Sequence, residues 1–287
     1  MTIFSPPSPP TQVAVTAPCV YDSHVHTPYC KHASGSLQEY AMEAFMHNLR
    51  GLTFTCHAPM PIDYSANIRM GLEEYDGYLA EIAATRAAWH GLLDLRRGLE
   101  ADFAPGLEQY LPGLLVQAPL DIVLGSVHPQ FPEYWDRYFD GNPTTFQQTY
   151  FSHLALAAES GLFDALTHAD LVRELFPDTW SYARVRRDIE RSLDRIARTG
   201  VAMEVNTSSF RRHFAETSPG PEMLAEIAAR GIPVLLSSDA HAPGRVGDRF
   251  AATLDLLTDL GFKQVSYFLG RQRHDLTIAE ARLSLIQ

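Results

Sequence analysis

IPVLLSSDAH, residues 232–241, is an apolar run that ends in a carboxylate and an imidazole. Similar runs recur along the chain, and we predict buried strands at 19–23, 52–56, 92–100, 121–127, 162–167, 201–205 and 232–238, with a possible eighth at 264–268. Longer amphipathic segments separate these runs, and such alternation is typical of βα units with a parallel sheet. Seven or eight units favour a closed or nearly closed barrel over an open sheet.

The ends of several predicted helices carry recognisable signals. Ser36 followed by Glu39 is the signature of a capping box at a helix start, and we predict that Gly51 closes this helix. Four further glycines lie between a helical run and a strand, where the residue after a helix belongs: Gly161, Gly200, Gly231 and Gly261. These positions support the division of the chain into βα units.

Composition limits the classes of partner. The 287 residues are 46% hydrophobic and 20% charged, and 34 Asp and Glu against 23 Lys and Arg give a formal charge of -11. An acidic surface has no general attraction for nucleic-acid phosphates or anionic lipids, so we expect neither partner. The chain also contains no apolar run of about 18 residues, which predicts that no segment spans a membrane.

The first 18 residues differ in composition from the rest of the chain. Residues 1–18 are rich in proline and predict a flexible leader, whereas 19–287 are predicted to form a single domain. The first thirty residues contain no Lys or Arg, so neither a signal peptide nor a transit peptide is indicated. The three cysteines form no C-x-x-C motif, and a reduced cytoplasm is the expected setting.

Side chains that bind metals follow the predicted strands. Seven of the twelve histidines and two acids lie at or just beyond strand ends: His24, His26, His32, His57, Glu100, His128, His168, Asp239 and His241. In a parallel barrel these ends share one face, where barrel enzymes keep their active sites. Nine ligands are too many for one ion and suggest two or three, with a bridging carboxylate. Imidazole and carboxylate together suit zinc, manganese or iron.

Other residues of the same types have simpler interpretations. His47, His90 and His153 fall within or at the ends of helices, where surface or packing roles are expected. Cys30 and Cys56 lie close in sequence to His32 and His57. We interpret both cysteines as small buried residues, with soft metal ligation as the alternative.

Six segments together resemble one known family. They are DSHVHTPYCKHA (22–33), LTFTCHAPMP (52–61), GLEADF (98–103), VLGSVH (123–128), MEVNTSSFRR (203–212) and SSDAHAP (237–243). In this order they resemble the PHP (polymerase and histidinol phosphatase) family, and most of all its histidinol-phosphatase branch. The resemblance implies a distorted (β/α)7 TIM-like barrel whose metal site lies at the C-terminal ends of the strands.

The resemblance also implies three divalent metal ions and their ligands. One ion would be held by His24, His26, Glu100 and Asp239, a second by Glu100, His128 and His168, and a third by His32, His57 and His241. Every ligand position of the family is filled in this chain. The ions would be zinc, manganese or iron.

The activity implied is hydrolysis of L-histidinol phosphate to L-histidinol and phosphate in histidine biosynthesis. A metal-bridging hydroxide would attack phosphorus, with Glu100, Asp239 and His241 as the catalytic residues. The alternatives are a phosphatase for another small phosphate ester, a PHP nuclease, which the acidic chain argues against, and a non-catalytic metal-binding barrel.

Further residues are expected to bind or support the substrate. Arg173, Arg211 and Arg212 are candidates for holding the phosphate, because a guanidinium donates two parallel hydrogen bonds, and Arg245 lies close to the same face. Asp170 and Asp102 are candidates for a substrate amine or a proton relay. Glu204 and Asn206 are expected to support the ligands.

The chain departs from the family at several places. Cys56 stands where the residue before His57 is usually acidic, which puts tuning of the third metal in question. Pro129 and Thr167 replace the aromatic residue and the glycine common at those positions. The aromatic insert 129–143 is interpreted equally as a packed lid or as a loop that selects the substrate.

Overall fold

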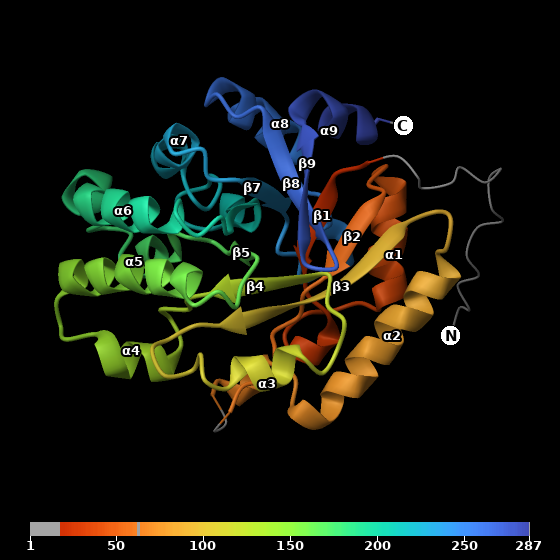
Figure 1. Cartoon of the computed structure of the whole chain (residues 1–287), viewed down its shortest axis with the longest axis horizontal. Helices are drawn as coiled ribbons and strands as arrows, with labels where there is room; N and C mark the ends of the chain where they lie inside the picture. The colour runs from red at the N-terminus through yellow and green to blue at the C-terminus, as the bar shows by residue number, and fades with distance from the viewer. Residues whose placement is uncertain (1–17, 62–63, 287) are drawn as a thin grey trace.

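The computed structural model describes residues 18–61 and 64–286. Its strands form one sheet in sequence order (Figure 1): β1 (Tyr21–Val25), β2 (Gly51–Phe54), β3 (Asp94–Asp102), β4 (Ile122–Ser126), β5 (Ala165–Leu166), β6 (Ala202–Asn206), β7 (Val234–Ser237), β8 (Gln264–Leu269) and β9 (Gln272–Thr277). Neighbours from β1 to β8 pair in parallel, and β9 pairs with β8 in the antiparallel direction. Each predicted strand is present, although β5 is shorter than predicted.

The sheet closes between its first and seventh strands. Val25 at the end of β1 forms a parallel bridge with Ala240, which follows β7. The backbone N–H of His26 donates to the Ala240 carbonyl at 2.9 Å. Closure after seven parallel strands confirms the predicted α/β barrel. The β8–β9 hairpin is added to it, with Tyr267 stacked on Tyr21 of β1 at a ring distance of 5.0 Å.

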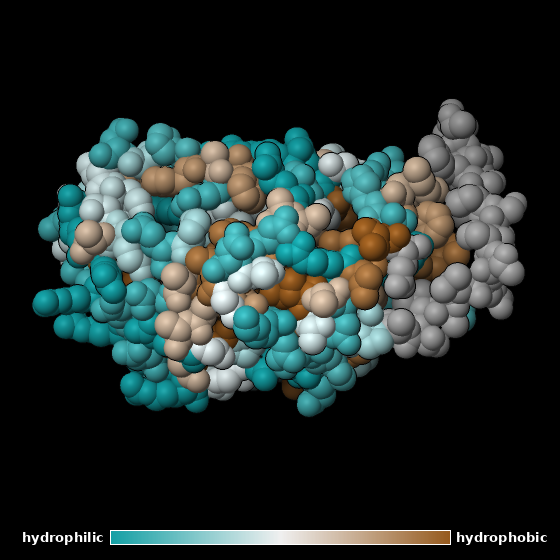
Figure 2. Space-filling view, turned by 90° about the horizontal axis from the view of Figure 1, so that it is seen from above, coloured by the Kyte–Doolittle hydropathy of each residue, from teal (hydrophilic) through white to brown (hydrophobic). Residues whose placement is uncertain are grey.

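Helices surround the sheet. They are α1 (Leu37–Met46), α2 (Tyr75–Ala88), α3 (Leu111–Leu115), α4 (Pro132–Tyr138), α5 (Pro143–Glu159), α6 (Tyr182–Ile196), α7 (Pro221–Ala229), α8 (Phe250–Asp259) and α9 (Ile278–Ser284). Helices α5 and α6 pack side by side, and the end of the molecule that they form is hydrophilic (Figures 1 and 2). No helix in the described part of the chain has both the length and the apolar character needed to cross a membrane.

The helix ends agree with the predicted signals except at Gly51. Ser36 and Glu39 form the capping box at the start of α1. That helix ends at Met46, and Asn48 takes the left-handed turn with φ 58°. Gly51 instead begins β2, where a Cβ would lie 2.5 Å from the ring of Tyr21. The prediction for Gly51 was therefore wrong: close strand contact, not a helix end, requires glycine there.

Strand β9 and helix α4 are present in the structure but were not predicted from the sequence. The sequence analysis missed β9, because its side chains are mostly exposed and show no apolar run. The insert 129–143 contains α4. The predicted leader lies outside the described residues apart from Pro18.

Candidate metal centre

The nine predicted ligands converge on one face of the barrel. His24 lies on β1 and Glu100 on β3, and the others lie just after β1, β2, β4, β5 and β7. Eight of the nine line a pocket of about 130 Å³. His24 is fully buried and contacts Glu100 and Asp239, which both line that pocket. Parallel strands bring their carboxyl ends together, which is why residues more than 200 positions apart meet here.

Glu100 lies at the centre of the cluster. Five imidazole nitrogens approach its carboxylate: His57 Nδ1 at 2.8 Å, His24 Nε2 at 3.4 Å and His26 Nε2 at 3.4 Å from Oε2, and His168 Nε2 at 3.1 Å and His128 Nε2 at 3.3 Å from Oε1. Ser126 donates a further hydrogen bond to Oε1 at 2.6 Å. The two oxygens face different histidines, as a carboxylate that bridges two ions does.

Two other groups of ligand atoms flank Glu100. Asp239 Oδ1 lies 3.2 Å from His26 Nε2, which is itself 3.0 Å from His24 Nε2. On the other side, nitrogens of His32, His57 and His241 lie within 4.8 Å of one another. The last trio is the set expected for a third ion. A further group consists of His57, Glu100 and His128. The family resemblance implies that Glu100 and His128 share an ion with His168, and not with His57.

Four imidazoles are held by hydrogen bonds from Nδ1 to oxygen. The donors and acceptors are His24 with Glu204 Oε1 (2.6 Å), His128 with Asp102 Oδ1 (2.6 Å), His32 with the Cys30 carbonyl (2.7 Å) and His241 with the Asp239 carbonyl (3.0 Å). A neutral ring that carries its proton on Nδ1 presents the lone pair of Nε2. Metal-binding histidines are held in the same way.

The buried carboxylates remain ionised. Burial alone would raise the pKa of Glu100, but the neighbouring histidines outweigh it and hold that pKa well below its usual range. The same balance lowers the pKa of Asp239. Burial lowers the pKa of His57 to about 3 and that of His241 to about 4, so both rings are neutral near pH 7. The carboxylates of Glu100 and Asp239 and the rings of His57 and His241 are thus in the protonation states that bind cations.

The backbone is strained at two of these ligands. Asp239 and His168 have φ values of 48° and 27°, which side chains other than glycine rarely adopt. Asn206 Nδ2 and Ser208 Oγ each donate to Asp239 Oδ2 at 3.2 Å, and the His168 N–H donates to Glu204 at 2.7 Å. Strain of this kind collects at functional sites and persists because neighbouring contacts hold it.

The donor set fits divalent cations. Glu100 Oε2 and His57 Nδ1 approach to 2.8 Å but have no hydrogen-bond partner among the described residues, although both are buried. Such atoms are costly to bury unless another group satisfies them. A cation between the carboxylate oxygen and the nitrogen lone pair would satisfy both.

The residues predicted for the substrate lie in different surroundings. Arg212 lines the same pocket as the ligands, with Nη2 3.8 Å from Asp239 Oδ2. Arg211 instead pairs with Asp248, which is also 3.8 Å from Arg245. The structure thus brings Arg212, and not its neighbour, to the ligand cluster.

Arg173 and Asp170 lie together outside the histidine pocket. Arg173 is buried and pairs with Glu216 at 2.6 Å and with Asp170 at 3.1 Å. Asp170 also accepts hydrogen bonds from the Ser218 hydroxyl and from the Gly220 N–H. Both residues line a second pocket of about 370 Å³.

Two contacts in the site were not predicted from the sequence. Arg69 is 1% exposed, and its Nη2 lies 2.8 Å from Asp102, the carboxylate that holds His128. No motif marks Arg69, which lies in a loop far from any strand end. The second contact is that of Phe131, which lines the pocket and stacks on the His128 ring at 4.4 Å.

The comparisons with known proteins agree with this geometry. The PHP domain family matches residues 22–208. The chain belongs to the PHP domain family. This PHP protein is 42% identical over 259 residues to the probable histidinol-phosphatase of Deinococcus radiodurans, covering 86% of this chain and 95% of that one. It is 29% identical to the histidinol-phosphatase of Bacillus subtilis, covering 82% and 98% of the two chains.

A solved structure shares the PHP fold. It is histidinol phosphate phosphatase from Lactococcus lactis, crystallised with zinc, L-histidinol and phosphate. The TM-score is 0.75 at 20% sequence identity, covering 89% of this chain and 98% of that one. This likeness confirms the fold expected from the six sequence segments.

Proposed function

We propose that this PHP protein is a metal-dependent phosphomonoesterase that hydrolyses L-histidinol phosphate to L-histidinol and phosphate. The observation that carries the proposal is the convergence of nine imidazole and carboxylate side chains, Glu100 among them, on one face of the barrel, every one in a position expected from the family. The identity to histidinol-phosphatases over nearly the whole chain supports the substrate.

We assign three divalent ions to the three ligand groups. His24, His26, Glu100 and Asp239 would hold the first, Glu100 and His128 with His57 or His168 the second, and His32, His57 and His241 the third. Zinc, manganese and iron all suit these donors. When bound, such ions neutralise phosphate oxygens, lower the pKa of water and stabilise the leaving alkoxide.

The protein's own groups position the phosphate ester. Arg212 is the guanidinium that lines the pocket, and it is proposed to bind phosphate oxygens through paired N–H donors. Glu100 and Asp239 keep the negative charge that binds the cations. His241 holds its proton on Nδ1 against the Asp239 carbonyl, which leaves Nε2 free as a ligand.

The start of the insert is proposed to select the organic part of the substrate. Gln130 and Phe131 line the pocket, and the flat ring of Phe131 offers an apolar face to the imidazole ring of L-histidinol phosphate. Farther along, Trp135 stacks on Phe176 at 5.8 Å and is not among the residues that line the pocket. Both interpretations of the insert therefore apply to different parts of it. Residues 130–131 contact the substrate, and the residues beyond them form a packed lid.

The test is release of inorganic phosphate from a panel of small phosphate esters by the manganese- or zinc-loaded protein. We expect kcat/KM for L-histidinol phosphate of about 10⁴ M⁻¹s⁻¹ or more, well above the other esters. The Glu100→Gln variant is the control for contaminating phosphatases. Equally weak activity on every ester of the panel would indicate that the substrate is another small phosphate ester. Cleavage of single-stranded DNA without activity on any ester would refute the proposal.

A further inference from the structure

His26 differs from the other pocket histidines in how its ring is held. Four rings donate from Nδ1 to an oxygen, as described above. The Nδ1 atom of His26 is buried and has no hydrogen-bond partner by ordinary geometry among the described residues, although the residue is only 1% exposed. Its Nε2 faces His24 and Asp239. The orientation of this ring therefore requires a different neighbour at Nδ1.

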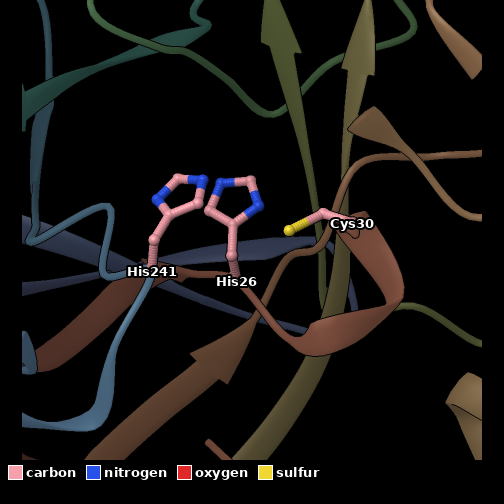
Figure 3. A group of neighbouring side chains, drawn as sticks. All are labelled: His26, Cys30 and His241. Atoms are coloured by element: carbon pink, nitrogen blue, oxygen red, sulfur yellow. The ribbon is translucent and has the colours of Figure 1, made fainter. Parts of the chain in front are cut away.

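The sulfur of Cys30 lies beside this ring. The Cys30 side chain is fully buried at the end of a short 3-10 helix, Pro28–Cys30, which follows β1. Its Sγ lies within 4.8 Å of ring nitrogens of both His26 and His241. Figure 3 shows the sulfur pointing at the His26 ring from the side opposite His241.

Cys30 is also connected to a second ligand. Its carbonyl accepts the Nδ1–H of His32 at 2.7 Å. The same residue thus contacts ligands from two of the three groups, His26 through sulfur and His32 through oxygen. Only the contact with His26 is made by the Cys30 side chain, so a substitution at Cys30 leaves the carbonyl acceptor of His32 in place.

The residue beside the sulfur is Cys56, which stands where the family usually has an acid. Cys56 is buried, and its thiol donates to the Thr27 carbonyl at 3.5 Å. Its side chain also interacts with that of Cys30. The Cys30 sulfur thus has a second buried thiol as its neighbour.

We propose that Cys30 is a positioning residue of the metal centre. Its Sγ accepts the Nδ1–H of His26 and directs the Nε2 lone pair toward the ion shared with His24, Glu100 and Asp239. Sulfur is a weak acceptor, but full burial excludes water as a competitor. The inference rests on the proposed function, because it requires an ion at these ligands.

The test measures cobalt(II) affinity by competition with a chelator, alongside phosphate release. We expect Cys30→Ala to lower the affinity about 10- to 100-fold, as loss of a partner that orients a ligand does. Cys30→Ser should lose less, because its hydroxyl also accepts a hydrogen bond. Cys19→Ser is the matched control, since Cys19 is a buried cysteine at the opposite end of β1, and it should bind cobalt as the wild type does.

The cobalt spectrum separates positioning from direct ligation. We expect the wild type to show ligand-field bands of a nitrogen and oxygen site without a sulfur-to-cobalt charge-transfer band. Such a band, if lost in Cys30→Ser, would make Cys30 a ligand and overturn the inference. Unchanged affinity in Cys30→Ala would also overturn it while leaving the proposed function intact. A wild-type protein that binds no divalent ion would contradict the proposed function itself.

Discussion

Replacing Asp102 by Asn should destabilise the protein far more than a typical substitution of a charged residue. Asp102 is 1% exposed, accepts from His128 Nδ1 at 2.6 Å and pairs with Arg69 Nη2 at 2.8 Å. These partners hold its pKa at about 2 despite burial. Asn keeps the shape but leaves the buried guanidinium of Arg69 without a counter-charge. Breaking such a pair costs about 3–5 kcal/mol of unfolding free energy.

The assay is urea unfolding of chelator-treated protein, so that bound metal does not contribute to the free energy. Four proteins complete the cycle: wild type, Asp102→Asn, Arg69→Met and the double variant. We expect the double variant to be less destabilised than the sum of the single variants by about 0.5–3 kcal/mol, because it has no unpaired charge. In the metal-loaded state, Asp102→Asn should also weaken metal binding about 10- to 100-fold, since His128 loses a charged acceptor.

An exposed ion pair provides the control. Glu190 accepts from Arg186 on α6 at 2.7 Å, where Arg186 is 57% exposed, so Glu190→Gln should cost less than about 1 kcal/mol. The reasoning is refuted if Asp102→Asn costs no more than Glu190→Gln. It is equally refuted if the effects of Asp102→Asn and Arg69→Met simply add.

Three further predictions address the centre and the fold. Glu100→Gln should lose both bound metal, measured by elemental analysis, and activity, because the carboxylate contacts ligands of two groups; retention of full metal would contradict the assignment. Arg212→Met should lower kcat/KM for the phosphate ester about 10-fold or more, whereas Arg211→Met, whose guanidinium pairs with an acid outside the pocket, should change it little. Equal losses would disprove this distinction. Burial lowers the pKa of His153, which contacts the Tyr134 hydroxyl at 2.8 Å, to about 4. The unfolded chain binds this proton below about pH 6.5, so stability should fall between pH 6.5 and 4, by up to about 3 kcal/mol; His153→Gln should remove that part of the slope in urea titrations.

Much of the candidate site could be predicted because its imidazole and carboxylate side chains follow strands. A parallel strand that is buried on both faces is a continuous apolar run, so its end is visible in the sequence. His57, His128 and Asp239 each follow such a run, and the barrel brings them together whatever the length of the connections. The motif positions of the family led to the same residues.

The supporting contacts could not be predicted in this way. Arg69 reaches Asp102 from a loop 33 residues earlier in the chain, and no periodicity marks either residue as a partner of the other. Arg173, predicted to bind phosphate, pairs with Glu216 at 2.6 Å, a contact that the sequence did not indicate. Long side chains choose their partners by reach and burial, which depend on segments that are distant in sequence.

The order of apolar runs, helix signals and imidazole and carboxylate residues by itself determined the barrel and the face that carries the candidate metal ligands. Local backbone preference and the pattern of burial depend on residues that are neighbours in sequence. The right-handed connection of parallel strands then leaves few possible topologies. Only the tertiary structure decided which arginine lines the pocket, which imidazole nitrogens are held by oxygen atoms and that a sulfur lies beside His26. These choices depend on distances of a few ångströms between side chains from different strands, and packing of the whole barrel sets those distances.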